Sequence, residues 1–319
     1  MNTTPVRDTT RCCIAGGGPA GMMLGYLLAR AGVATTVLEK HADFLRDFRG
    51  DTVHPSTLRV LDDLGLLDAF LHRPHQKLRY PGSLHRRAAR SHRRLQRPAA
   101  TLRLHRDDAA VGVPGFPGSE ARNMPHFTLR MQAEVDGLLS DAEGHVLGVK
   151  GHRTGEGKVP RDNRFELLAG CTIACDGRHS TVRAAAGLPV HEVGAPIDVL
   201  WFRITRDPAV TDTSLARIGP GRFLVTLDRG DYWQCAFVIP KGGAEALQAQ
   251  DIAVLRGQVA EAAPFLGPWL GDLRGWDDVK LLSVAIDRLT QWSLPGLLCI
   301  GDAAHAMSPV GGVGINLAI

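Results

Sequence analysis

The stretch from Arg11 to Lys40 constrains the fold more than any other part of the sequence. It begins with an apolar run typical of a buried strand, and Gly16, Gly18 and Gly21 follow in G-x-G-x-x-G spacing. An apolar pattern of helical period comes next, and a second apolar run ends at Glu39. This order predicts a strand–helix–strand unit of a parallel sheet, in which the glycine turn and the helix N-terminus bind the phosphates of a dinucleotide.

Each glycine of this turn has its own expected role. Gly16 permits the tight turn, Gly18 lets backbone N–H groups approach a pyrophosphate, and Gly21 lets the helix pack closely on the strand. Glu39 follows at about the usual 20 residues, where a carboxylate accepts hydrogen bonds from a ribose. The pattern does not distinguish FAD from NAD. The residues expected to line this part of the nucleotide site are Gly16, Gly18, Pro19, Ala20, Gly21, Glu39 and Lys40.

Length and composition indicate a soluble globular protein. The chain has 319 residues, 44% of them hydrophobic, which is enough for one large or two ordinary domains. No apolar signal core begins the chain, and the uncharged run 12–29 contains the glycine pattern, so we expect no membrane span. The six cysteines suit neither a zinc site nor a disulfide framework, which predicts reduced thiols, no metal and a cytoplasmic location.

The middle of the chain predicts a series of short elements. Ser56 is a candidate N-cap of an amphipathic helix rich in leucine, and residues 127–152 have the pattern of a small antiparallel meander. Residues 164–175 form a further strand or pair of strands. A short helix capped by Ser180 or Thr181 is expected after it.

Residues 189–292 have a different texture, with several strand-like runs around one helical stretch and all five tryptophans of the chain. We expect a second, mainly antiparallel layer there, suited to the wall of an apolar pocket. Tyr232, Trp233 and Gln234 are candidates for that wall, although alternation along a strand places such residues half in the core and half on the surface.

Three separated motifs together resemble the class A FAD-dependent aromatic hydroxylases, the group of para-hydroxybenzoate hydroxylase. They are the glycine pattern with Glu39, the pair Asp176-Gly177, and the segment from Gly301-Asp302 through His305 to Gly312-x-Gly314-x-Asn316. The resemblance covers most of residues 10–78 and 127–319. It implies an α/β fold, with a Rossmann-like FAD-binding domain and an inserted, mainly antiparallel β substrate domain.

The resemblance also implies a function. The family holds one FAD, reduces it with NADH or NADPH, captures O2 as a flavin C4a-hydroperoxide and hydroxylates a small aromatic, phenolic substrate. Asp302 would bind the ribityl chain, Arg49 would lie near the pyrophosphate and ribityl region, and Asp176 belongs to a motif linked to both FAD and the nicotinamide cofactor. Catalytic acids and bases vary in the family, so none is assigned.

The last motif is expected to approach the flavin ring. A helix that starts near Gly312 and Gly314 would direct its N–H groups toward the flavin N1 and C2 carbonyl, with Ile315 and Asn316 in its first turn. His305 is expected to be an ordinary hydrogen-bonded helix histidine. By the same resemblance, residues 1–78, 127–188 and 281–319 form the FAD-binding domain, and residues 79–126 and 189–280 form the substrate domain.

One window departs from the family pattern. Residues 83–106 hold eight arginines, three histidines and no acidic residue. A basic arm for nucleic acid or an acidic partner is one interpretation, but the segment contains no aromatic residue, so no nucleic-acid partner is expected. We favour the hypothesis that residues 79–124 are read in a shifted frame, which resequencing of the gene would test. Relatives continue beyond the position of Ile319, so we also expect a truncated, poorly soluble or weakly active chain.

Two alternatives remain open at this stage. One is a different flavoenzyme of the same fold, such as a halogenase or a reductase. The other is an inactive fragment that binds flavin without turnover. The expected partners are O2 and a small aromatic substrate, and a homodimer is left open.

Overall fold

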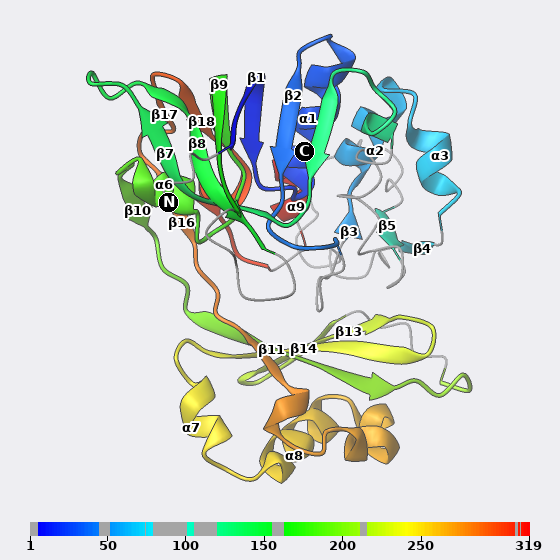
Figure 1. The fold of residues 1–319 in the computed structure, drawn as a ribbon. Helices are drawn as coiled ribbons and strands as arrows, with labels where there is room; N and C mark the ends of the chain where they lie inside the picture. Colours follow the sequence, from blue (N-terminus) through cyan, green and yellow to red (C-terminus); the bar gives the residue numbers. More distant parts are fainter. Residues whose placement is uncertain are drawn as a thin grey trace, which may run out of the picture.

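The computed structural model in Figure 1 contains two main sheets, an eight-stranded one and a five-stranded one. The residues that the structure describes are 6–44, 52–73, 75–78, 101–104, 120–154, 163–210, 216–309, 312 and 314–319.

The eight-stranded sheet has a parallel centre. Its main path runs β17-β18-β9-β1-β2-β6, and every neighbouring pair from β18 to β6 is parallel. The last four residues of β1 are buried, as expected for a strand that is covered on both faces. The strands of this path are β1 (Val6–Ala15), β2 (Thr35–Leu38), β6 (Phe127–Arg130), β9 (Arg164–Ala174), β17 (Ser293–Leu294) and β18 (Leu297–Cys299).

Helix α1 (Pro19–Arg30) connects β1 to β2 and covers one face of this sheet, as the glycine pattern predicts. Met22, Met23 and Tyr26 are buried on its inner side. The other face packs against the antiparallel hairpin of β7 (Ala133–Ser140) and β8 (Val146–Arg153). The predicted fold class is confirmed. The meander differs from expectation, because β6 joins the parallel sheet, whereas β8 pairs antiparallel with both β7 and β9.

The leucine-rich segment forms two helices rather than one. These are α2 (Pro55–Asp63) and α3 (Leu67–Leu71), and the break between them contains Gly65 at a φ of 73°. The prediction that Ser56 is the N-cap is wrong. His54 holds that position because Pro55 already has the φ that the first helical residue requires.

A small three-stranded sheet of order β3-β5-β4 joins this region to the anomalous window. Its strands are β3 (Thr52–Val53), β4 (His75–Leu78) and β5 (Thr101–Leu104). Residues 79–100 and 105–119 lie outside the described residues. The reading-frame hypothesis therefore stays a prediction.

The five-stranded sheet is antiparallel throughout, with the order β12-β13-β14-β11-β15. One face packs on α8 (Ile252–Ala262) and the 3-10 helix Pro264–Asp272, and its other face is turned toward the eight-stranded sheet (Figure 1). The domain boundaries given above stay a prediction. The strands are β11 (Ile197–Thr205), β12 (Ala216–Gly219), β13 (Arg222–Asp228), β14 (Tyr232–Pro240) and β15 (Lys280–Leu282).

Shorter elements complete the described structure. A separate three-stranded sheet has the order β10-β16-β19, and α7 precedes α8 in the chain. No helix among the described ranges is both long and apolar enough to cross a membrane. The remaining elements are α6 (Thr181–Ala185), α7 (Ala244–Gln248), α9 (Gly314–Ala318), β10 (Val190–Glu192), β16 (Asp287–Leu289), β19 (His305–Ala306) and the 3-10 helices Trp276–Asp278 and Gly301–Ala303.

Asp198 fixes the start of the five-stranded sheet. Its buried carboxylate accepts hydrogen bonds from Lys241 Nζ and from the backbone N–H groups of Gly242 and Val284, each at 2.9 Å. Burial alone would raise the pKa of Asp198, but the lysine and the two N–H donors outweigh it and lower the pKa below its ordinary value. This carboxylate thus joins β11, the end of β14 and the chain after β15.

The cysteines are all free thiols, as expected. Burial raises the pKa of Cys12 to about 12 and that of Cys299 to about 11. These thiols are therefore neutral at physiological pH, and they add no negative charge beneath the glycine turn.

Candidate functional site

The glycine turn has the geometry that each of its glycines predicts. Gly16 has a φ of 107°, and a Cβ there would lie 2.3 Å from the carbonyl oxygen of Cys175. A Cβ at Gly21 would lie 2.0 Å from the carbonyl oxygen of Gly16, so helix and turn are in the closest possible contact. A Cβ at Gly18 would meet nothing within 4 Å. The space in front of the helix N-terminus is therefore open beside Gly18, where a pyrophosphate would lie.

Glu39 lies directly beside this turn. Its carboxylate is buried and accepts a hydrogen bond from the N–H of Gly17 at 2.9 Å, and its other oxygen accepts one from the N–H of His41 at 3.1 Å. The ring Nδ1 of His41 lies 2.5 Å from the same oxygen. Lys40 follows as an exposed residue. The chain thus places a carboxylate at the end of β2 and next to the glycine turn, as the sequence predicts.

Asp176 also reaches the turn, although its carboxylate serves another element. Its backbone N would lie 2.8 Å from a Cβ at Gly16, so the two motifs are in contact. The carboxylate accepts hydrogen bonds from Ser180 Oγ at 2.5 Å and from the N–H of Val182 at 3.1 Å. Ser180 is the N-cap of α6, which confirms one of the two residues predicted for that position. The side chain of Asp176 therefore holds the N-terminus of α6 rather than facing the open space.

Arg183 was not singled out from the sequence, yet it joins two of the three motifs. Its guanidinium donates to the carbonyl oxygens of Arg178 at 2.7 Å and Ala303 at 3.3 Å, and it lies 3.6 Å from the carboxylate of Asp287. The Arg183 side chain is mostly buried. The only sequence signal is its position three residues after the N-cap of α6. Its partners come from distant parts of the chain, which a sequence pattern does not show.

Asp302 lies in the 3-10 turn Gly301–Ala303, at the end of β18. A Cβ on Gly301 would lie 3.1 Å from Cβ of Ala20 and 3.8 Å from Cβ of Ala318, so this turn packs between the start of α1 and α9. Asp302 is half-buried, and its carboxylate has no hydrogen bond or ion pair within the described part of the chain. It is thus a carboxylate near the start of α1 that is available to a ligand.

The last motif approaches the same region through α9. Gly312 has a φ of 62°, and a Cβ on Gly314 would lie 3.7 Å from the nearest protein atom, Cγ of Met307. Ile315 is half-buried against the core cluster beneath α1. Asn316 accepts hydrogen bonds through Oδ1 and donates one to the carbonyl oxygen of Gly312 at 3.1 Å.

The side chain of Asn316 holds α9 to the start of α2. Its Oδ1 accepts from the N–H of His54 at 2.7 Å and from Thr57 Oγ1 at 2.9 Å. We expect Asn316→Leu, which keeps the branched shape of the side chain, to lower the free energy of unfolding by about 1–3 kcal/mol because two donors lose their acceptor. Urea denaturation measures this difference. A variant Leu317→Ala, at an exposed position of the same helix, is the control, and an equal loss in both variants would contradict the assignment.

Two further predictions have different outcomes. Arg49 lies outside the described residues, so its place near the cofactor stays a prediction. His305 lies in β19 rather than in a helix, and its ring stacks on Trp292 with centroids 5.3 Å apart. In the described ranges no group of three or more His, Cys, Asp or Glu residues could hold a metal ion.

The residues present fit an FAD molecule. The Gly16 turn contacts the Asp176 segment, and the Gly301 turn contacts the start of α1, so the three motifs meet around one open helix N-terminus. The donor and acceptor groups have the required chemistry, with N–H groups for phosphate and carboxylates for hydroxyl groups.

Comparison with known proteins decides the family. Residues 9–319 match the model of a family described as an FAD binding domain. The chain is 32% identical over 316 residues to a 6-methylpretetramide 4-monooxygenase of Streptomyces rimosus. The aligned region covers 97% of this chain and 72% of that protein. The chain belongs to the class A FAD-dependent monooxygenases.

Other FAD-dependent monooxygenases are similar over most of this chain. A 3-(3-hydroxy-phenyl)propionate/3-hydroxycinnamic acid hydroxylase of Klebsiella pneumoniae is 25% identical, over 98% of this chain and 54% of its own length. The structure of PqsL, a probable FAD-dependent monooxygenase from Pseudomonas aeruginosa, aligns with a TM-score of 0.71 at 19% identity, over 98% of this chain and 83% of that one.

Not every similar protein of this fold is a hydroxylase. The halogenase CndH aligns with a TM-score of 0.70 at 19% identity, over 98% of this chain and 72% of that one, which shows the shared fold alone. The fold therefore does not separate the halogenase alternative from hydroxylation. The relatives that are named monooxygenases favour hydroxylation.

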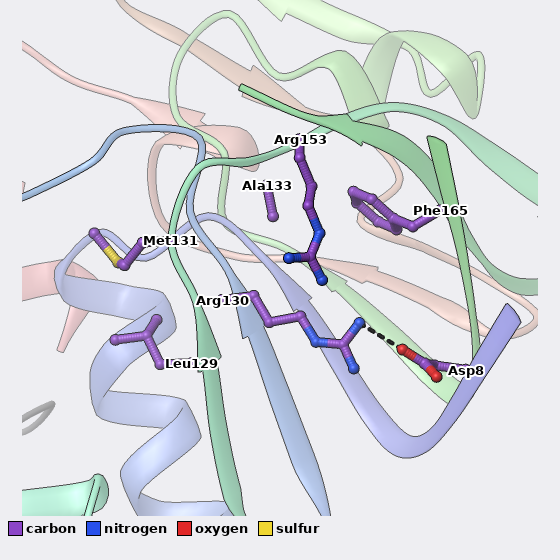
Figure 2. Close-up of a pocket in the computed structure, with 7 residues that line it drawn as sticks. All are labelled: Asp8, Leu129, Arg130, Met131, Ala133, Arg153 and Phe165. Atoms are coloured by element: carbon purple, nitrogen blue, oxygen red, sulfur yellow. Dashed lines mark ion pairs between the residues drawn. The ribbon is translucent and has the colours of Figure 1, made fainter. Parts of the chain in front are cut away.

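A separate cavity lies at the edge strand β6 (Figure 2). It has a volume of about 330 Å³, and Arg130 Nη1 and Asp8 Oδ2 form an ion pair 2.8 Å long in its wall. Ala133 and Phe165, also in the wall, belong to the core cluster on the side of the sheet opposite α1. The cavity includes none of the predicted cofactor residues, so we do not assign it to the FAD site.

Proposed function

We propose that this chain binds one FAD and uses O2 and NADH or NADPH to hydroxylate a small aromatic, phenolic substrate. The observation that carries this proposal is the contact of the three motifs around the open N-terminus of α1. The relatives that are named monooxygenases and hydroxylases support the reaction type. Bound FAD would supply the redox chemistry, by accepting reducing equivalents from the nicotinamide and reacting with O2.

The chain's own residues would hold FAD along its length. The N–H groups at Gly18, Ala20 and Gly21 lie at the N-terminus of α1, where the first turn of a helix has no acceptor of its own, and would bind the pyrophosphate. The carboxylate of Glu39 would bind the ribose, because it lies buried at the end of β2 beside the glycine turn. Pro19 starts the helix with a fixed φ and contributes no N–H.

Asp302 would bind the hydroxyl groups of the ribityl chain, because its carboxylate has no protein partner in the described part of the chain. Gly312 and Gly314 would let the backbone approach the flavin ring, with Ile315 and Asn316 behind them. Asp176 would act through the backbone of its segment, since its side chain caps α6. Arg49 and Lys40 would add positive charge near the phosphates.

The five-stranded sheet would cover the substrate. Its face opposite α8 is turned toward the eight-stranded sheet (Figure 1), so substrate would lie between the two. In this proposal residues 1–78, 127–188 and 281–319 bind FAD, and residues 79–126 and 189–280 bind substrate.

Turnover tests this function. We expect the FAD-loaded chain to oxidise NADH or NADPH slowly alone and at least tenfold faster with a suitable phenol, with one atom of ¹⁸O₂ in the product. A panel of phenols and aromatic ketones is screened by the fall in nicotinamide absorbance. Stimulated oxidation that yields only hydrogen peroxide, or no stimulation by any compound, would contradict the proposal and favour the flavin-binding fragment.

Substitution of Asp302 tests the cofactor site separately. We expect Asp302→Ala to weaken FAD binding by about tenfold or more, because two or more hydrogen bonds to a charged acceptor are lost. The melting temperature of the FAD-free protein should stay the same, since the carboxylate has no protein partner within the described residues. Glu245→Ala, which removes an exposed carboxylate from α7, is the matched control. Equal FAD affinities in the two variants would contradict the role of Asp302.

A further inference from the structure

Two buried hydrogen-bond donors in the five-stranded sheet lack an acceptor among the described residues. They are Nε1 of Trp201, on β11, and Nε2 of Gln234, on β14. Trp201 is 9% exposed and Gln234 is 3% exposed, so both side chains are largely shielded from bulk solvent. Buried polar groups without a partner are rare and costly in native proteins, and those that persist frequently serve a ligand.

Both donors lie on the same face of the sheet. Trp201 is paired with Ala236 and Arg203 is paired with Gln234 in the β11–β14 register, so Trp201 and Gln234 are diagonal neighbours. The residues that alternate with them, including Phe202 and Cys235, pack on the α8 side. The two donors therefore lie on the opposite face, which Figure 1 shows turned toward the eight-stranded sheet.

A neighbouring arginine fixes the orientation of the Gln234 amide. Nε of Arg229 donates to Oε1 of Gln234 at 2.9 Å, and both side chains are buried. A guanidinium has no acceptor, so a reversed amide would set donor against donor. The NH2 group of Gln234 must therefore be the end that is not bonded to Arg229.

The surroundings of Trp201 are apolar, whereas Gln234 lies against Arg229. Trp201 packs in a cluster with Val199, Leu227, Ala236 and Val284. Apolar residues beside two N–H donors that lack an acceptor suit a flat ring that carries an oxygen acceptor. A hydroxyl group of a hydrocarbon ring needs an acceptor for its proton as well, so a carbonyl oxygen is the better match.

We propose that Gln234 and Trp201 select substrates in which the aromatic ring carries a ketone-type carbonyl, which accepts hydrogen bonds from these two donors. The inference rests on the proposed hydroxylation and names its substrate class. Arg229 acts as a positioning residue, because it fixes the amide through Oε1 and leaves Nε2 for the ligand. Gln234 and Trp201 bind the carbonyl end of the substrate and leave the rest of the ring for the flavin.

The test compares two phenols that differ only at one carbon, 4-hydroxyacetophenone and 4-ethylphenol. Each is titrated into the FAD-loaded chain at pH 6, where both phenols are neutral, and binding is read from tryptophan fluorescence. We expect the ketone to bind about tenfold more tightly, the effect of one or two hydrogen bonds. Equal affinity for the two compounds, or binding of neither, would overturn the inference.

Two variants locate the effect. Gln234→Glu keeps an oxygen for Arg229 but replaces the NH2 donor with an acceptor, so the preference for the ketone should disappear while 4-ethylphenol binds within twofold of the original. Trp201→Phe keeps the ring and removes the N–H, and it should reduce the preference about threefold. Gln291→Glu, at an exposed position, is the matched control and should keep the preference. A preference that persists in both variants would overturn the inference.

The flavin spectrum separates this inference from the proposed function. All variants should take up FAD like the original chain, because neither residue lies at the glycine turn. A chain that shows the ketone preference but no FAD uptake would contradict the proposed function alone. Normal FAD uptake without the ketone preference would contradict this inference alone.

Discussion

Gly21→Ala is expected to abolish FAD binding and to destabilise the fold. A Cβ at this position would lie 2.0 Å from the carbonyl oxygen of Gly16 and 3.1 Å from Cγ2 of Ile14, so α1 would have to move away from the turn. Forced overpacking of this kind costs about 1–3 kcal/mol, and the displaced helix N-terminus no longer faces the phosphates. Flavin fluorescence quenching measures FAD affinity, and urea denaturation measures the free energy of unfolding.

Two other glycine variants control this experiment. Gly18→Ala adds a Cβ where no protein atom lies within 4 Å, so the fold should be unchanged while FAD affinity falls at least tenfold. Gly257→Ala, within α8, also has free space and should raise the free energy of unfolding by about 0.5–1 kcal/mol without any effect on FAD. If Gly18→Ala bound FAD as tightly as the original chain, the phosphate-binding part of the FAD site would not lie in front of α1.

Asp198→Ala is expected to cause the largest loss of stability in the five-stranded sheet. The buried carboxylate accepts from Lys241 and from the N–H groups of Gly242 and Val284, and its removal leaves those two N–H groups without an acceptor. Two buried donors without partners cost about 2–5 kcal/mol together. Urea denaturation followed by tryptophan fluorescence measures the change, since most tryptophans lie in this part of the chain.

Asp231→Ala provides the control, because this aspartate is exposed at the turn before β14 and should change the free energy of unfolding by less than about 0.5 kcal/mol. Similar losses in the two variants would show that the three hydrogen bonds of Asp198 do not stabilise the sheet. The result to compare is therefore the loss of unfolding free energy in Asp198→Ala against the loss in Asp231→Ala.

The stabilisation by Asp198 should also depend on pH in a defined direction. Its pKa is lower in the folded chain than in the unfolded chain, so the unfolded chain binds more protons in acid. The contribution is complete above the unfolded pKa of about 3.9 and is lost as the pH falls through the lower folded pKa. The gap in unfolding free energy between the original chain and Asp198→Ala should thus be constant from pH 7 to 5 and shrink below pH 4. A gap that grows in acid would contradict this account.

The sequence predicts local features of the site well. Gly16, Gly18 and Gly21 occupy the predicted turn, and the close approach of Gly21 to Gly16 lies within six consecutive residues. The cap at Ser180 is likewise a contact between residues three apart. Such features are readable because the chain positions that interact are close along the sequence.

Contacts between distant segments could not be predicted in the same way. Arg183 reaches Ala303, and Asn316 reaches the start of α2 across more than 250 residues of chain. These partners are set by the packing of the sheet, which no periodicity or motif spacing encodes. The expected cap at Ser56 failed for a local reason, the preference of Pro55 for the first helical position.

The central claim is that three separated segments of this chain form one FAD site. An equilibrium titration of the purified, FAD-free chain with FAD, followed by flavin fluorescence quenching and the visible spectrum, tests it most directly. The account predicts saturation at one FAD per chain, with a dissociation constant that rises at least tenfold both in Gly18→Ala and in Asp302→Ala. Folded protein that stays colourless in excess FAD, or variants that both bind FAD as tightly as the original chain, would contradict it.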